Sequence, residues 1–167
     1  MDMDFEKRLQ IYIQEHTDAP GDVILATRLL VRSANMLESR INAVLEPMGI
    51  HIHEYLALMV IKSEGGPIRP TELSDTLGIS RPQITRLLDT LEQRGLIVRK
   101  HSTTDRRALM LSLSAKGKRQ LESASSTVHK AYLTSWQQGV KQLPSLLKGL
   151  RTLYTTLRET DDALFSK

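Results

Sequence analysis

The sequence predicts a mainly α-helical protein that carries one small β-hairpin. Apolar residues recur at helical spacing over most of the 167 residues, and two short alternating stretches flank a polar loop between residues 96 and 113. Aromatic residues make up only 4% of the chain. The core is therefore expected to be aliphatic and built largely from leucine.

The composition is that of a globular protein and excludes several classes of function. Hydrophobic residues account for 40% and charged residues for 25% of the chain, as in an ordinary globular domain. No apolar run has the length of a membrane span and no signal-peptide pattern opens the chain, so a cytoplasmic location is expected. Cysteine is absent, which excludes disulfides, thiol catalysis, zinc-ribbon sites and thiol-based oxidant sensing.

The first 50 residues are expected to form helices that serve in dimerisation. A short amphipathic helix is expected within residues 1–19, and the segment 20–22 interrupts it. A long helix then follows from Val23 to Met48, because its apolar residues recur at a/d spacing over about three to four heptads. These residues are Val23, Leu30, Ala34, Leu37, Ile41, Val44 and Met48. Gly49 is expected to end this helix.

The next two helices are predicted by different signals. Residues 51–63 are apolar on most faces, which indicates a buried helix. The Gly-Gly-Pro segment at 65–67 is a firm break. A short helix is then expected over 69–78, with Pro70 in its first turn and Gly78 in the turn that follows.

A further helix follows that turn at once. Ser80 and Gln83 have the spacing of a capping box. The apolar residues after them lie at i, i+3, i+4 and i+7, which gives the helix one apolar side. They are Ile84, Leu87, Leu88 and Leu91. Two helices joined by a tight glycine-containing turn make a helix-turn-helix, whose second helix enters the DNA major groove.

A β-hairpin is predicted directly after the helix-turn-helix. The segments 96–101 and 108–113 alternate apolar and polar residues as half-buried strands do, and the polar loop 102–107 joins them. A hairpin with basic residues near its tip, placed after a helix-turn-helix, is a wing. The segment 51–113 is therefore predicted to be a winged helix-turn-helix.

The remaining residues, 114–167, are expected to form helices that complete the dimerisation region. One helix is expected from Ser114 to about Gly139, and a last one begins at Leu143. Leucines at a/d spacing run along this last helix, and residues 160–167 are expected to fray. The leucines are Leu143, Leu146, Leu150, Leu153 and Leu157.

The distribution of charge points to nucleic acid. The segment from Ser80 to Arg107 holds seven basic and three acidic residues, a surplus of four that equals the net charge of the whole chain. Elsewhere the charges balance at 16 of each sign. A surplus confined to one short segment is typical of a nucleic-acid-binding surface.

The same segment resembles a known family. The motifs are Leu-Glu-Gln-Arg-Gly-Leu-Ile at 91–97, Asp-Arg-Arg at 105–107 and Leu-Ser-Leu-Ser at 111–114, followed by Gly117. Together they resemble the multiple antibiotic resistance regulator (MarR) family of winged-helix transcription factors, with Ser114 in place of the usual Thr. The specific motifs lie within residues 71–117, and the order of elements agrees over about 22–160. The resemblance implies a homodimer whose two heads read the half-sites of a pseudo-palindromic operator.

DNA contacts are predicted on the second helix and the wing. Arg, Gln and Thr on the second helix would address bases or phosphates. In the wing, Arg107 would enter the minor groove with Asp105 holding it, and the other basic residues would bind phosphates. The predicted DNA-binding residues are Ser80, Arg81, Gln83, Thr85, Arg86, Arg99, Lys100, Asp105, Arg106 and Arg107.

A small-molecule site is implied by the resemblance, because members of the family commonly bind anionic aromatic or lipophilic ligands near the long first helix. The residues of this chain suited to such a pocket are Arg28, Arg32, Met36, His53, Tyr55 and Met59. Arginine suits a carboxylate, and Met and Tyr supply an adaptable apolar wall. The competing interpretation is that the apolar members are core and that the arginines are solvated.

Other functions find less support in the residues. No nucleophile elbow, phosphate loop or paired-carboxylate motif is present, so an enzyme is not expected, and no cofactor is predicted. His51 and His53 with Glu54 form a possible metal set, although His51 also suits a helix cap. The predicted function is a ligand-released dimeric repressor. The alternatives are an effector-free, non-specific or architectural DNA-binding protein and a protein-interaction module.

Overall fold

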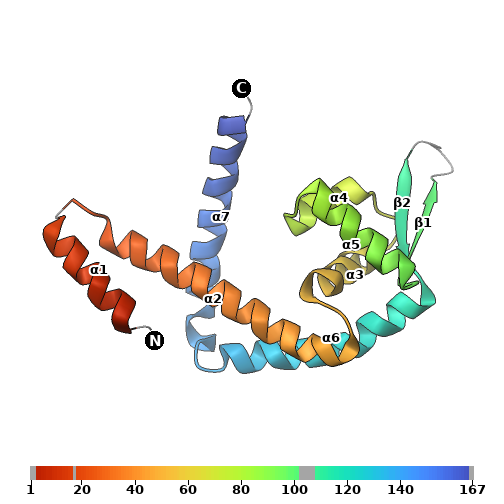
Figure 1. Ribbon diagram of the computed structural model, residues 1–167, viewed down its shortest axis with the longest axis horizontal. Helices are drawn as coiled ribbons and strands as arrows, with labels where there is room; N and C mark the ends of the chain where they lie inside the picture. Colours follow the sequence, from red (N-terminus) through yellow and green to blue (C-terminus); the bar gives the residue numbers. More distant parts are fainter. Residues whose placement is uncertain (1–2, 17, 102–107, 166–167) are drawn as a thin grey trace. The chain divides into compact units, whose positions relative to one another are not determined.

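The computed structural model describes residues 3–16, 18–101 and 108–165. Its elements follow one another along the chain as drawn in Figure 1. They are α1 (Met3–Glu15), α2 (Gly21–Leu45), the 3-10 turn η1 (Glu46–Met48), α3 (Ile52–Ser63), α4 (Pro70–Leu77), α5 (Arg81–Gln93), β1 (Ile97–His101), β2 (Leu109–Leu113), α6 (Ala115–Trp136), the 3-10 turn η2 (Val140–Gln142) and α7 (Leu143–Phe165). The predicted mainly α-helical fold with one hairpin is confirmed.

The chain forms two compact units, Met1–His129 and Lys130–Lys167. The first unit holds the helix-turn-helix and the hairpin, and the second consists of the end of α6, η2 and α7. The predicted division at residues 50 and 113 is a division by function, and it stays a prediction.

Helix ends differ from the prediction in three places. The long helix stops at Leu45, because Pro47 cannot continue an α-helix and the chain tightens into η1. The helix α6 ends at Trp136 and not near Gly139. At the end of the chain, α7 stays helical to Phe165, so fraying from residue 160 was wrong. Thr160 donates its hydroxyl hydrogen bond to the Thr156 carbonyl at 2.8 Å, which keeps this polar residue compatible with the helix.

The start of α3 and the start of α4 are fixed by the same device. The His51 N–H donates to the Glu54 carboxylate at 2.9 Å, and the Arg69 N–H donates to the Glu72 carboxylate at 2.9 Å. Each acidic residue lies three positions inside its helix. It therefore satisfies a main-chain donor and also places negative charge at the positive end of the helix dipole.

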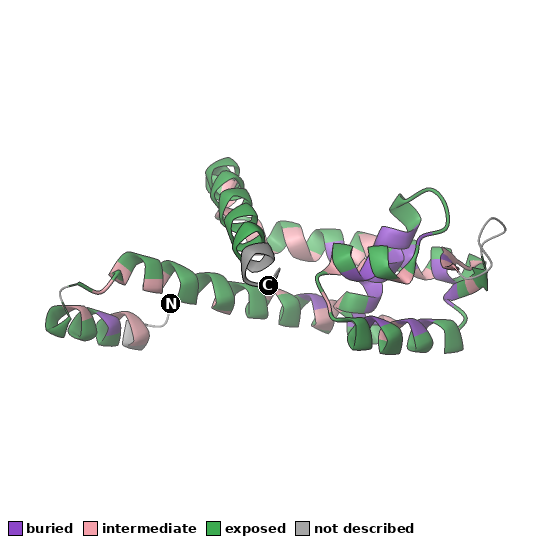
Figure 2. Cartoon of the chain, turned by 90° about the horizontal axis from the view of Figure 1, so that it is seen from above, coloured by how far each residue is buried: buried purple, intermediate pink, exposed green. Residues whose placement is uncertain are grey.

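The core lies in the first unit, where α3, α4, α5 and β2 meet the end of α2. Figure 2 shows the buried residues gathered there. The larger side chains with almost no exposed surface are Ile41, Leu45, Ile50, Leu58, Leu73, Leu91, Leu96, Leu111 and Val128. All of these are aliphatic, so the predicted aliphatic core is confirmed. The prediction that the helix after residue 51 is buried is also confirmed, since six of its residues are buried.

The start of α6 packs closely against the residues that follow α5. A Cβ added to Gly117 would lie 2.0 Å from the Leu96 carbonyl oxygen, so only glycine fits. The Ser114 hydroxyl donates to the Gly95 carbonyl at 2.6 Å and accepts from the Gly117 N–H at 2.9 Å. These contacts tie α6 firmly to the end of the helix-turn-helix.

Exposed apolar side chains gather on the long helices. On α2, Val23 is 63% exposed and Met36 is 67% exposed. On α7, in the second unit, Leu153 is 42% exposed and Leu157 is 55% exposed. Surfaces of this kind are unusual on a helix that meets only water.

Among the described residues, no single helix combines the length and the hydropathy of a membrane span. The segments Gly21–Met48 and Ile52–Ser63 meet them only as a pair, by length and composition, across a bend of 81°. The second segment of this pair is α3, most of whose apolar residues are buried in the core, although Met59 is exposed.

Candidate nucleic-acid interface

The turn between α4 and α5 is closed by specific contacts. Gly78 adopts a left-handed conformation with φ of 64°, which a residue with a Cβ adopts at a cost. The buried Ser74 side chain donates its hydroxyl hydrogen bond across the turn to the Ile79 carbonyl at 2.7 Å. The angle between the two helices is therefore held by a left-handed glycine and a satisfied polar side chain.

The helix α5 has one buried side and one open side. Ile84, Leu88 and Leu91 are 3%, 2% and 0% exposed, and they anchor the helix to the core. The polar residues between them are exposed, and Leu87 is half-buried. The exposed residues of α5 are Arg81, Pro82, Gln83, Thr85, Arg86, Asp89, Thr90, Glu92 and Gln93. The predicted base-reading residues of this helix therefore all lie on its open side.

Two of these side chains already make local hydrogen bonds. The Gln83 amide oxygen accepts from the Ser80 N–H at 3.0 Å and from the Ser80 hydroxyl at 2.7 Å. The Thr85 hydroxyl donates to the Arg81 carbonyl at 2.9 Å. The free groups are then the Gln83 amide N–H₂, which is a donor, and the Thr85 methyl. Bidentate reading of adenine by Gln83 would require the cap to open.

The hairpin is antiparallel and regular. Ile97 pairs with Leu113, Arg99 with Leu111 and His101 with Leu109. In β2 only Leu111 is fully buried, and it also exchanges backbone hydrogen bonds with Ile68, which precedes α4. The wing is thus joined to the helix-turn-helix through the backbone. The predicted wing-tip residues Asp105, Arg106 and Arg107 lie outside the described residues.

Arg99 forms ion pairs with α5, the recognition helix, which is the helix predicted to enter the DNA major groove. Its guanidinium lies 2.5 Å from an Asp89 carboxylate oxygen and 3.1 Å from a Glu92 carboxylate oxygen, and its side chain is only 19% exposed. The two carboxylates are three residues apart on α5 and therefore face the same way. These ion pairs connect β1 to α5. They also compensate the positive charge of Arg99, which the sequence analysis assigned to phosphate binding. Its neighbour Lys100 is exposed.

Arg94 also takes part in the fold. Its guanidinium donates to both oxygens of the buried Glu54 carboxylate, at 2.8 and 3.0 Å, and to the Gly49 carbonyl at 2.6 Å. The end of α5 is thereby joined to the start of α3. Sequence reasoning missed this pair because its members are 40 residues apart.

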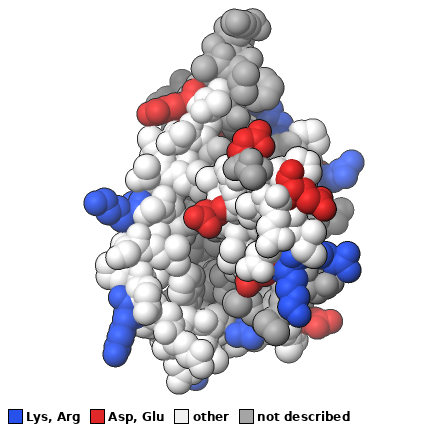
Figure 3. All heavy atoms as spheres, turned by 90° about the vertical axis from the view of Figure 1, so that its left-hand side faces the viewer, with Lys and Arg blue, Asp and Glu red and all other residues white. Residues whose placement is uncertain are grey.

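The remaining cations of the recognition helix are unengaged. Arg81 and Arg86 are exposed, and neither has an ion-pair partner among the described residues. By contrast, acidic and basic side chains are interspersed on the face of the molecule drawn in Figure 3, as far as its described residues show. The unpaired positive charge of the described part of the winged helix therefore includes Arg81, Arg86 and Lys100.

The predicted effector residues lie in contrasting surroundings. Tyr55 is 3% exposed and belongs to the core, whereas Met36 is 67% and Met59 is 40% exposed. The Arg28 guanidinium lies 5.5 Å from the centre of the Phe5 ring, which connects α2 to α1. Arg32 is half-buried and His53 is exposed.

The histidines at the start of α3 do not converge with acidic groups. No cluster of three or more His, Asp or Glu side chains suited to a metal occurs among the described residues. The carboxylate of Glu54, which the sequence placed beside His51 and His53, is engaged by Arg94.

A capped recognition helix with an open polar side, followed by an antiparallel wing, defines a winged-helix DNA-binding protein. Residues 48–108 match the model of the MarR family. Over 132 residues the chain is 37% identical to the transcriptional repressor MprA of Escherichia coli K12, covering 78% of this chain and 75% of that protein. The chain belongs to the MarR family and is a DNA-binding transcriptional regulator, as the sequence predicted, not an enzyme.

Solved structures agree with this assignment. CouR of Rhodococcus jostii RHA1, crystallised with p-coumaroyl-CoA, is 27% identical with a TM-score of 0.64, covering 73% of this chain and 88% of CouR. The C80S mutant of MarR from E. coli, crystallised with operator DNA, has a TM-score of 0.70 over 80% of this chain and 98% of MarR. At 24% identity the second likeness speaks for the fold alone.

Proposed function

We propose that this protein is a sequence-specific repressor that binds a pseudo-palindromic operator as a homodimer and is released by a small anionic ligand. One observation carries the DNA-binding part. The open side of α5 presents Arg81, Thr85 and Arg86 together, while its opposite side is fixed in the core. The similarity to a protein named as a repressor supports the sign of regulation.

On the recognition helix, the arginines are the strongest candidates for base contacts. Arg81 and Arg86 are exposed and have no ion-pair partner among the described residues. Their guanidinium groups are therefore available to bind guanine O6 and N7. The Thr85 methyl suits a thymine methyl. Gln83 keeps its amide oxygen on the Ser80 cap and offers its N–H₂ group to an acceptor.

In the wing, we assign different roles to the basic residues. Lys100 and Arg106 bind phosphates, and Arg107 enters the minor groove with Asp105 positioning it. Arg99 acts indirectly, because Asp89 and Glu92 already hold its guanidinium. Its proposed role is to keep the wing at a fixed distance from α5.

The homodimer is supported by the apolar residues that the single chain leaves exposed. On α7 these include Leu146, Leu153 and Leu157, all at least 40% exposed and spaced at helical intervals. Burial of these side chains against a second copy removes apolar surface from water at both helices. Two heads would then read half-sites about one helical turn apart.

The proposed effector is a small anionic, aromatic or lipophilic compound, as the p-coumaroyl-CoA bound to CouR suggests for a relative. Release requires that the ligand bind the DNA-free arrangement more tightly than the DNA-bound one. Shifting the protein from about 99% in the DNA-binding arrangement to about 99% in the DNA-free arrangement takes about 5.5 kcal/mol of differential affinity. Two symmetric ligand sites can share this amount. Arg28, Arg32, Met36, His53, Tyr55 and Met59 remain the candidate ligand residues.

The test is selection of binding sites from random duplex DNA, followed by titration of the selected site. An enriched palindrome is expected. Arg86→Ala should weaken binding to it by about 1–3 kcal/mol, whereas Lys148→Ala on α7 should leave binding unchanged. Enrichment of no sequence would favour the effector-free architectural protein. A panel of aromatic acids added to the complex then tests release, and Arg32→Ala should blunt that response.

A further inference from the structure

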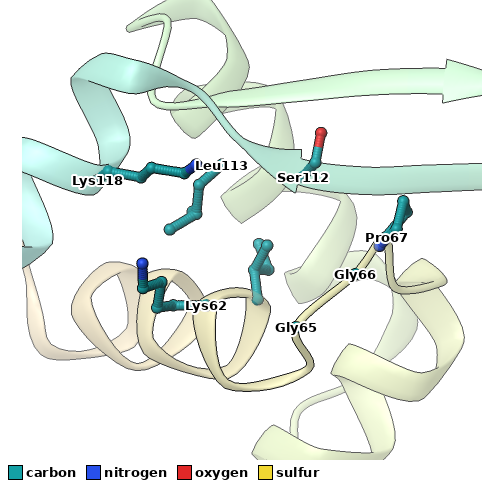
Figure 4. Close-up of a pocket in the computed structure, with 8 residues that line it drawn as sticks. Lys62, Gly65, Gly66, Pro67, Ser112, Leu113 and Lys118 are labelled. Atoms are coloured by element: carbon teal, nitrogen blue, oxygen red, sulfur yellow. The ribbon is translucent and has the colours of Figure 1, made fainter.

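A cavity of about 240 Å³ opens on the winged helix (Figure 4). It lies between the end of α3, the loop at 65–67, the end of β2 and the start of α6. None of the ten predicted DNA-binding residues and none of the six predicted effector residues lines it. The volume is below the range of about 300–1,000 Å³ found for drug-sized ligands, so a matching ligand is small.

Two ammonium groups enter this cavity from different helices. Lys62 of α3 and Lys118 of α6 extend into the same space in Figure 4. No acidic residue lines the cavity, and neither lysine has an ion-pair partner among the described residues. Lys118 lies near the start of α6, where the helix dipole is already positive, so helix stability does not explain its place. Both lysines are exposed to solvent, so their positive charges lie at the open side of the cavity, where no described acidic group compensates them.

Apart from Ser112, apolar side chains and the glycine backbone form the rest of the wall. Ile61, Pro67 and Leu113 line the cavity beside the lysines, and the main chain of the Gly65-Gly66 segment leaves its rim open. A ligand with an anionic end and a small apolar body matches this division.

The walls of the cavity are held in place by contacts outside it. Backbone hydrogen bonds of 3.1 and 2.8 Å join Ile68 to Leu111 and so fix the 65–67 loop against β2. The close contact of Gly117 with the Leu96 carbonyl fixes the start of α6, and hence the backbone of Lys118. The site is therefore largely formed before a ligand arrives, which lowers the cost of binding.

We propose that this cavity binds a small phosphate monoester with an apolar body, its phosphate held between Lys62 and Lys118. A phosphate monoester carries a charge of about −1.5 to −2 at pH 7, which matches the two ammonium groups. A monocarboxylate would leave one of them uncompensated. Lysine is a common phosphate ligand, acting as a point charge. Because the cavity touches both β2 of the wing and α6, occupancy is expected to alter DNA affinity, and this clause alone rests on the proposed function.

The experiment is calorimetric titration of the full chain with phenyl phosphate. The double variant Lys62→Gln/Lys118→Gln is expected to bind about tenfold more weakly or worse. The matched control is Lys141→Gln/Lys148→Gln, which removes the same charge from two lysines that are likewise exposed but do not line the cavity, and it should bind as the wild type does. Affinity should rise as the pH passes about 6, where the second phosphate proton leaves. Benzoate and inorganic phosphate should both bind more weakly than phenyl phosphate.

Three results would overturn the proposal: equal affinity of the two double variants, equal affinity for inorganic phosphate and phenyl phosphate, or no saturable binding with a Kd below about 1 mM. Operator binding is measured separately by fluorescence anisotropy. A ligand effect on DNA affinity that the Lys62→Gln/Lys118→Gln variant loses supports the regulatory clause, and an unchanged DNA affinity overturns that clause alone. Failure to bind any operator would count against the proposed function and leave the calorimetric result intact.

Discussion

The winged helix and the long terminal helix differ in how far each satisfies its own apolar surface. The winged helix buries Leu73, Leu91 and Leu111 completely, together with the end of α2. In α7 none of residues 143–160 is buried, and Leu157 remains 55% exposed (Figure 2). The first region holds its conformation through contacts within one chain. The second has the composition of an interface and is expected to acquire its core from another molecule.

The difference also separates two kinds of charge. In the winged helix, Arg94 and Arg99 are held by carboxylates and serve the fold, while Arg81 and Arg86 remain open. A count of charges along the sequence treats all four alike. The contact geometry divides them into two that are ion-paired and two that are exposed and proposed to face DNA, and each group predicts a different response to mutation.

The largest expected effect tests the incomplete region. Leu150→Asp places a carboxylate in the proposed apolar interface and should weaken dimerisation by about 3 kcal/mol or more. Thr152→Asp adds the same charge at an exposed position two residues away and should be tolerated. Sedimentation velocity without DNA measures both. If the wild type sediments as a compact monomer, the exposed leucines of α7 are not buried by a second copy, and the proposed contrast between α7 and the winged helix is wrong.

The next effect tests the self-contained region. Arg94→Met leaves the Glu54 carboxylate buried without its partner and should lower the free energy of unfolding by about 2–4 kcal/mol, toward the lower value because the Arg94 side chain is 33% exposed. Arg81→Met, at an unpaired exposed position, should change it by less than about 0.5 kcal/mol. Urea unfolding is the measurement. Adding Glu54→Gln to Arg94→Met should recover part of the loss, and no recovery would contradict the role given to the ion pair.

A smaller effect distinguishes positioning from direct contact at Arg99. Arg99→Met should weaken operator binding by about 1 kcal/mol without altering the dependence of affinity on salt, because no phosphate contact is lost. Glu92→Gln should change affinity in the same direction, although it removes a negative charge. Anisotropy titrations over a range of salt concentrations decide the matter. A reduced salt slope for Arg99→Met would return this residue to the phosphate-binding group.

The smallest effect is expected at Lys100, whose exposed side chain is proposed to contact only phosphate. Lys100→Met should weaken all DNA sequences alike, by less than about 1 kcal/mol, and reduce the salt slope by roughly one unit. The same titrations used for Arg99 provide the comparison. A changed sequence preference in this variant would mean that Lys100 contacts bases.

Local patterns were enough to predict most of the fold. The caps of α3 and α5, the helix ends at Gly49 and Gly78, and the alternation in the hairpin all depend on residues only a few positions apart. Helix ends were less predictable. The end of α2 at Leu45 depends on Pro47, and α7 continues to Phe165 although the residues after 160 do not favour a helix strongly.

The candidate site was predictable only in part. The open side of α5 follows from helical spacing, so its exposed residues were found correctly. The ion pairs of Arg94 and Arg99 join segments 40 and 10 residues apart, and no periodicity reveals such a pair. The cavity with Lys62 and Lys118 likewise forms only when α3 meets α6, and neither lysine stands out in the sequence.

The close packing at Gly117 has a consequence for how this sequence can vary. Every replacement there adds a Cβ that would lie 2.0 Å from the Leu96 carbonyl oxygen, and a backbone atom cannot rotate away as a side chain can. Gly149 in α7 has nothing within 4 Å of the corresponding point, and alanine there should gain up to about 1 kcal/mol of helix propensity. In a library of all single substitutions selected for repression, position 117 should be depleted of every variant, while position 149 should accept many residues.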